Sequence, residues 1–173
     1  MELDFTSDVV EKLVLRRALT DKEWLGTLSG VFDRRWFKTR YLSTTLSLVL
    51  RFYDKYGKAP SAPVVAAMAK KYAEHHPEDQ FSEAGANALV QEALASGLDV
   101  DDEVVGANIR EFVRKNAFSA SLMDSIDLLS GADSERDSEK YRQIVDSCLE
   151  KFDRVQRMAF GDSDLGLDYF DKA

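Results

Sequence analysis

The chain has 173 residues, of which 45% are hydrophobic and 31% charged, with a single cysteine and a formal net charge of −8. Its length suits one domain with an extension, no apolar run reaches the roughly 20 residues of a membrane helix, and one cysteine excludes an internal disulfide, so we expect a cytoplasmic protein. Residues 1–60 carry 11 Lys and Arg against 8 Asp and Glu and the remainder 12 against 23, so the chain is a poor general binder of nucleic-acid phosphates.

Two short helices are predicted at the start of the chain. Thr6 or Ser7 can cap the first, whose buried side consists of Val10, Leu13, Val14 and Leu15. Residues 20–23 match the capping box, in which Thr20 caps the second helix and Glu23 reaches back to it. The second helix carries Trp24, Leu25 and Leu28 and ends near Gly30.

A segment that mixes cations with aromatic rings follows at residues 33–40. Its basic side chains are Arg34, Arg35, Lys38 and Arg40, and Trp36 and Phe37 lie between them. Basic and aromatic residues in alternation are typical of a surface that contacts nucleic acid or an acidic partner. The alternative, which we favour, is a loop whose rings fill the core while its charges stay in solvent.

Three further helices are predicted in the first hundred residues. The first spans Tyr41–Tyr56, has an inner face of Leu42, Leu46, Val49, Leu50 and Tyr53, and stops at Gly57. Ser61 caps the next helix, which ends before Pro77. Ser82 caps the third, which continues through Leu94 toward Gly97.

The longest helical pattern lies between residues 101 and 158. One apolar stripe comprises Val105, Ile109, Phe112, Leu122, Ile126 and Leu129. After a polar turn at residues 131–138, a second stripe comprises Tyr141, Ile144, Val145, Cys148, Leu149, Phe152 and Val155. Two facing stripes joined by a short link predict an antiparallel helical hairpin, in which Cys148 is a buried and unreactive thiol.

The whole chain is therefore predicted to be an all-α protein of about seven helices. We expect a compact helical bundle at residues 1–97, a long antiparallel hairpin at 98–158, and an acidic, glycine-punctuated linker or tail at 159–173.

Sequence motifs for catalysis are missing. There is no P-loop, no Gly-x-Ser-x-Gly elbow and no His-Glu-x-x-His helix. The only histidines, His75 and His76, are adjacent, so on a helix they point about 100° apart and cannot both grip one metal. We expect no catalytic residue, no metal and no cofactor in this chain.

The order of these elements resembles the N-terminal domain of DnaB-type replicative helicases, most closely the phage members. The likeness begins with residues 11–25, continues through 31–37 and 46–61, and includes the hairpin. Residues 164–170, Asp-Leu-Gly-Leu-Asp-Tyr-Phe, resemble the linker ahead of the motor domain of that family. The chain ends where the motor would begin, so we expect it to be the N-terminal part of a longer helicase.

This resemblance implies a non-catalytic collar on a helicase ring, which mediates oligomerisation and docks primase or a helicase loader at the replication fork. ATP and Mg²⁺ would belong to the motor domain, and contact with single-stranded DNA would be weak for this part. The implied partners are further copies of the chain, as a dimer or hexameric ring, and primase or a loader. A phage-encoded protein would work in the host cytoplasm.

The hairpin offers the residues for packing or subunit pairing, because one small domain cannot cover all its large apolar side chains. The candidates are Ile109, Phe112, Phe118, Leu122, Ile144 and Phe152. A purely internal core role is an equal alternative for each. Two other functions stay open: the helicase-binding C-terminal domain of a primase, and a stand-alone phage adaptor or inhibitor of the helicase.

Overall fold

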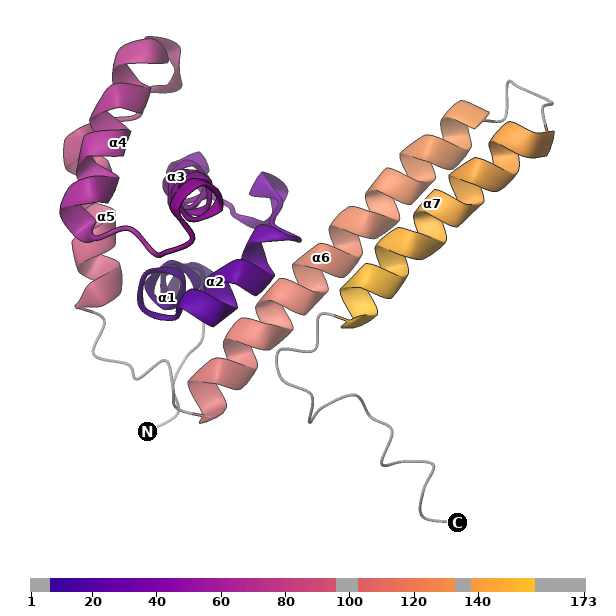
Figure 1. Ribbon diagram of the computed structural model, residues 1–173, viewed down its shortest axis with the longest axis horizontal. Coiled ribbons are helices and arrows are strands. Elements are labelled where there is room, and N and C mark those ends of the chain that lie inside the picture. Colours follow the sequence, from indigo (N-terminus) through magenta and orange to yellow (C-terminus); the bar gives the residue numbers. More distant parts are fainter. Residues whose placement is uncertain (1–6, 96–102, 133–137, 158–173) are drawn as a thin grey trace. The chain divides into compact units, whose positions relative to one another are not determined.

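The computed structural model describes residues 7–95, 103–132 and 138–157 (Figure 1). Within these ranges the chain is all-α, as predicted, and contains no strand. The predicted tail at 159–173 lies outside the described residues. The elements are α1 (Ser7–Thr20), α2 (Lys22–Ser29), the 3₁₀ turn η1 (Arg34–Trp36), α3 (Arg40–Tyr56), α4 (Ala62–His75), the 3₁₀ turn η2 (Pro77–Asp79), α5 (Glu83–Leu94), α6 (Glu103–Ala132) and α7 (Ser138–Arg157).

The chain divides into two compact units, Met1–Phe112 and Val113–Ala173. The division falls later than the predicted boundary at residue 97, because the first turns of α6 belong to the N-terminal unit. Ile109 is completely buried there, and the ring of Phe112 lies 5.8 Å from that of Phe37.

The N-terminal unit is built around α1, which packs against α2, α3 and α5, while α4 packs against α3 and α5. The predicted inner faces of the first helices are confirmed, since Leu13, Val14, Leu25, Leu46 and Val49 are almost fully buried. The core also includes a polar side chain that the apolar pattern did not reveal. Glu11 is 2% exposed, and its Oε1 accepts a hydrogen bond from the Ser7 hydroxyl at 3.0 Å.

Most helix ends follow the predicted signals, although the Ser61 side chain makes no capping hydrogen bond and the C-cap of α5 is Ala95. Gly57 ends α3 in the left-handed conformation at φ 63°, and the Ser82 hydroxyl caps α5 by accepting from the Gly85 amide at 3.1 Å. The capping box at Thr20 was wrong, since Thr20 is the last residue of α1. The cap of α2 is Asp21, whose carboxylate accepts from the Trp24 amide at 2.9 Å, because an aspartate one residue later serves equally well.

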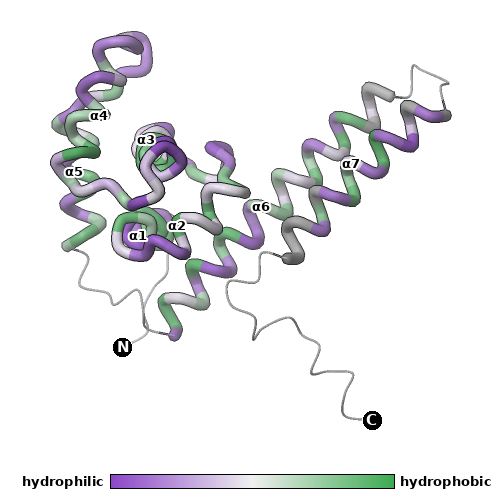
Figure 2. Tube along the Cα trace, viewed as in Figure 1, coloured by the Kyte–Doolittle hydropathy of each residue, from purple (hydrophilic) through white to green (hydrophobic). Residues whose placement is uncertain are grey.

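The second unit comprises α7 and α6 from Val113 onward. The ring of Phe118, early in this part of α6, lies 5.6 Å from that of Phe152, late in α7, as expected of an antiparallel pair. Cys148 is buried, as predicted. Hydrophobic and hydrophilic residues alternate along both helices in Figure 2.

The apolar residues predicted as a single stripe on α6 have different environments in the two halves of the helix. Val105 and Ile109 are buried, but Leu122 and Ile126 are 43% and 49% exposed. A helix 30 residues long turns its apolar positions gradually around its axis, so residues that share a pattern need not share an environment.

Candidate functional site

The basic segment at residues 33–40 is built around two buried aromatic rings. The Asp33 carboxylate caps η1 by accepting from the Arg35 amide at 2.8 Å, and this tight turn points Trp36 and Phe37 inward. These rings are 4% and 7% exposed, whereas the basic side chains of the segment are all exposed. This arrangement agrees with the interpretation we favoured from the sequence, a loop whose rings fill the core while its charges stay in solvent.

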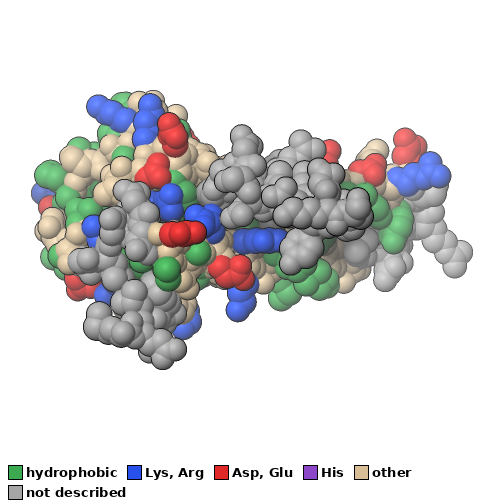
Figure 3. Space-filling model, turned by 90° about the horizontal axis from the view of Figure 1, so that it is seen from below, with side chains coloured by type: hydrophobic (Ala, Val, Ile, Leu, Met, Phe, Trp, Pro, Cys, Tyr) green, Lys and Arg blue, Asp and Glu red, His purple; other side chains and the backbone are tan. Residues whose placement is uncertain are grey.

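The four cations of this segment have different local partners. Arg34 Nε donates to the Ser47 hydroxyl of α3 at 3.0 Å, and Arg35 pairs with Asp33 within the turn. Lys38 Nζ lies 4.0 Å from the Asp8 carboxylate, and both groups are exposed, so the pair contributes little. On the face in Figure 3, basic and acidic side chains lie intermixed over the N-terminal unit rather than in one basic field.

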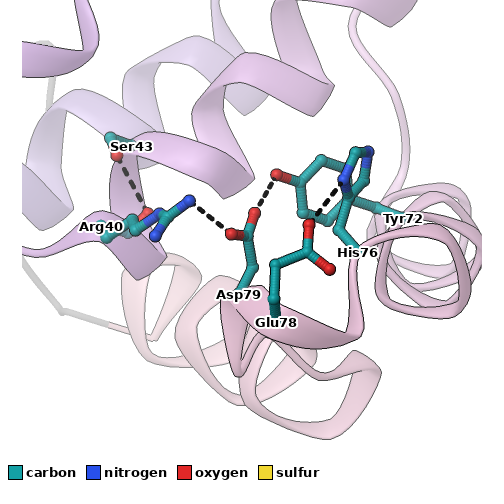
Figure 4. A network of polar contacts seen from close by, with 6 residues as sticks. All are labelled: Arg40, Ser43, Tyr72, His76, Glu78 and Asp79. Atoms are coloured by element: carbon teal, nitrogen blue, oxygen red, sulfur yellow. Dashed lines mark hydrogen bonds and ion pairs between the residues drawn. The ribbon is translucent and has the colours of Figure 1, made fainter.

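Arg40 belongs to a polar network that holds η2 in place (Figure 4). Its guanidinium pairs with the Asp79 carboxylate, which also accepts a hydrogen bond from the Tyr72 hydroxyl of α4 at 2.5 Å. Asp79 is nearly buried, with 8% of its side chain exposed, whereas the Arg40 side chain is 71% exposed, so solvent screens the ion pair on the side of Arg40. His76 adds a ring contact, its centroid 4.4 Å from that of Tyr72.

This network raises the pKa of Tyr72 above its usual value near 10. The main cause is the hydrogen bond to Asp79, which favours the protonated phenol; burial and the negative charge of Asp79 act in the same direction, and Arg34 opposes them. Tyr72 is therefore a hydrogen-bond donor at neutral pH and not a base. Its chemistry here is structural, since it ties α4 to η2.

A groove between α3 and α4 was not predicted from the sequence. Its volume is about 430 Å³. The apolar part consists of Leu48, Phe52, Tyr56, Met68 and Tyr72, and the rim carries Arg51, Lys55, Lys71, His75 and His76.

The groove could have been recognised from the outer face of α3. Phe52 and Tyr56 are spaced four residues apart, as are Arg51 and Lys55, which places a ring pair beside a cation pair. The two rings do contact each other, with centroids 4.5 Å apart and planes inclined at 42°. The prediction had followed only the inner face of this helix.

The cations at the rim of the groove are not neutralised locally. Among the described residues, no carboxylate lies within 4 Å of the charged nitrogens of Arg51, Lys55 or Lys71. Lys55 instead lies over the ring of Tyr56, with Nζ 5.2 Å from the centroid. The groove therefore combines an apolar floor with unpaired positive charge, which suits an acidic ligand with apolar side chains.

The residues predicted for subunit pairing fall into two groups. Ile109 and Phe112 belong to the N-terminal unit, where Phe112 is half-buried and Ile109 is completely buried, so Ile109 is not available at an outer surface. In the second unit, Phe118 is 50% exposed and Leu122 43%, whereas Ile144 and Phe152 are half-buried.

Exposed apolar side chains are concentrated on α6 and α7. Of the ten large hydrophobic side chains exposed in the described ranges, eight belong to these two helices. Phe118, Leu122 and Ile126 follow one another at spacings of four, which forms a continuous row on α6, and Met123 lies beside it at 60% exposure. We call these four residues the α6 stripe. Hydrophobic side chains also lie at the surface in the right half of Figure 3, where α6 and α7 are drawn.

Other kinds of site find no support in the described part of the chain. No three His, Cys, Asp or Glu side chains come together there in a way that could hold a metal ion. None of the helices described combines the length and apolar character of a membrane span. Comparisons with protein-family models, characterised proteins and solved structures find no match to this chain.

Proposed function

We propose that this chain is a non-catalytic assembly module that associates with further copies of itself through the α6 stripe. The exposure of this stripe carries the proposal. A soluble protein rarely leaves a row of large apolar residues in water unless another surface covers it. The covering surface we propose is the same stripe on a second copy, because a symmetric pair buries both stripes at once.

The particular role we propose is the N-terminal collar of a DnaB-type replicative helicase. The support is the order of helices that resembles this family, together with the all-α fold and the α6 stripe. In this role the chain would dock primase or a loader, and ATP hydrolysis would be the task of a motor domain outside it. The protein would then work in the cytoplasm, that of the host cell if a phage encodes it.

Sedimentation velocity across a concentration series from about 1 to 500 μM tests self-association. We expect the weight-average mass to rise with concentration, and to rise further at high salt, which strengthens apolar contacts while screening the net negative charge. A mass equal to that of one chain at every concentration would refute the assembly proposal.

A separate titration tests the helicase role. The C-terminal domain of the primase encoded in the same genome is added to the labelled chain, and an unrelated helical domain of similar charge serves as the control. We expect saturable binding to the primase domain only. Self-association without primase or loader binding would leave an assembly module but contradict the collar role.

A further inference from the structure

We propose that the groove between α3 and α4 binds the acidic, aromatic segment at residues 160–171 of this same chain. The groove belongs to the N-terminal unit and the α6 stripe to the second, so this binding is distinct from the self-association proposed above. The segment lies outside the described residues, and its sequence and the geometry of the groove carry the argument.

The charges of the two surfaces are complementary. Residues 160–171 contain Asp162, Asp164, Asp168 and Asp171 and no Lys or Arg. The rim of the groove carries Arg51 and Lys55 on the α3 side and Lys71 on the α4 side, none of which has an acidic partner among the described residues. In a protein of net charge −8, three such cations around one groove form a local site for an anionic group.

The apolar parts also match. The segment ends in Asp168-Tyr169-Phe170-Asp171, two aromatic rings with a carboxylate on each side. The lining of the groove includes the apolar side chains Leu48, Phe52 and Met68 together with the cations of α3 and α4. A volume of about 430 Å³ is at the small end for ligand pockets and accommodates two or three side chains, so it suits the aromatic pair and not the whole segment.

The arrangement favours a peptide over a nucleic acid. The lining mixes the aliphatic side chains Leu48 and Met68 with the rings of Phe52, Tyr56 and Tyr72, a combination that buries the aliphatic and the aromatic side chains of a peptide. Phosphate binding also requires a wider positive field than three cations on an otherwise acidic chain.

The test is photocrosslinking in the full chain. Tyr169 is replaced by p-benzoylphenylalanine, the protein is irradiated, and the crosslinked peptides are identified by mass spectrometry. We expect crosslinks to the α3 and α4 peptides that line the groove, with Met68 as the main site because benzophenone reacts readily with methionine. Crosslinks only to other parts of the chain would overturn the proposal.

Two charge-reversal variants make the test specific. Arg51→Glu/Lys71→Glu changes the rim, and we expect the groove crosslink to fall about tenfold, because two attractions become repulsions. Lys58→Glu/Lys70→Glu makes the same change in charge at exposed residues that do not line the groove, and we expect the crosslink to persist. Equal yields from both variants would contradict the proposal, provided that circular dichroism shows both to be folded.

A binding assay tests whether the groove binds the peptide segment or a single-stranded nucleic acid. A fluorescent peptide of residues 158–173 is titrated into the full-length Tyr169→Ala/Phe170→Ala variant, whose own segment no longer competes. We expect saturable binding that weakens about tenfold in the rim variant, and no displacement by a single-stranded oligothymidylate. Displacement by the oligonucleotide, or absence of peptide binding, would overturn the proposal. Mixing isotope-labelled and unlabelled chains before irradiation tells whether the segment comes from the same chain or a second copy.

Discussion

The double substitution Leu122→Glu/Ile126→Glu is the sharpest perturbation of the proposed self-association. The four residues of the α6 stripe are between 43% and 60% exposed. Full burial of such a side chain contributes about 1.5–3 kcal/mol, so covering the exposed half contributes about 1 kcal/mol each, or about 8 kcal/mol for two stripes in a symmetric pair. Association costs roughly 4–15 kcal/mol in lost freedom of motion, so a pair through this stripe alone is weak.

The double variant removes half of that contribution in each copy. The loss is about 4 kcal/mol per pair before the cost of placing carboxylates against one another, which corresponds to about a thousandfold in the dissociation constant. Sedimentation velocity at matched concentrations is the assay, and we expect the variant to stay monomeric where the unchanged chain associates.

A matched control separates the stripe from the added charge. Asn87→Glu/Gln91→Glu places two carboxylates at the same spacing on an exposed face of α5 in the N-terminal unit. We expect this control to associate as the unchanged chain does. If it loses association equally, or if the stripe variant associates within about threefold of the unchanged chain, the reasoning from exposed apolar area is refuted.

Three further predictions concern the N-terminal unit. Leu46→Ala removes a fully buried side chain from α3, and we expect a loss of about 3 kcal/mol in the free energy of unfolding, measured by urea denaturation. Gly57→Ala places a side chain at φ 63°, and we expect a loss of about 1 kcal/mol although the space around it is open. Asp79→Asn removes the carboxylate that raises the pKa of Tyr72, and we expect that pKa to fall back toward 10 in a titration of tyrosine absorbance. Because the pKa of Tyr72 is higher in the folded state, the hydrogen bond from its phenol contributes fully to the free energy of unfolding below pH 10. This contribution is lost as the pH rises through the folded-state pKa. We expect the Asp79→Asn variant to show no such loss.

The inner faces of the first helices could be predicted because periodicity alone marks them. Leu13 and Leu46 each lie on a short amphipathic helix, where a residue on the apolar side has only the core to face. The caps at Gly57 and Ser82 could also be predicted, since they depend on local backbone chemistry. Thr20 was misplaced because two adjacent residues were both competent caps.

The candidate sites were less accessible to prediction. Arg40 was singled out for its charge, but its partner Asp79 is 39 residues away in sequence, and no local pattern joins them. Arg51 and Lys71 were not singled out, because each lies on the outer face of a different helix and they line one groove only when α3 and α4 pack.

Local sequence patterns were enough to predict that this protein is helical, where most helices begin and end, and which faces of the short helices are buried. These properties depend on neighbours within one or two turns of the chain, where the spacing of residues decides the outcome. The packing of the helices was needed to show which part of α6 belongs to the N-terminal unit, which apolar residues of α6 remain in water, and which cations are already paired. Those properties depend on residues distant in sequence, because burial and pairing are set by whatever surface arrives next to a side chain when the helices pack.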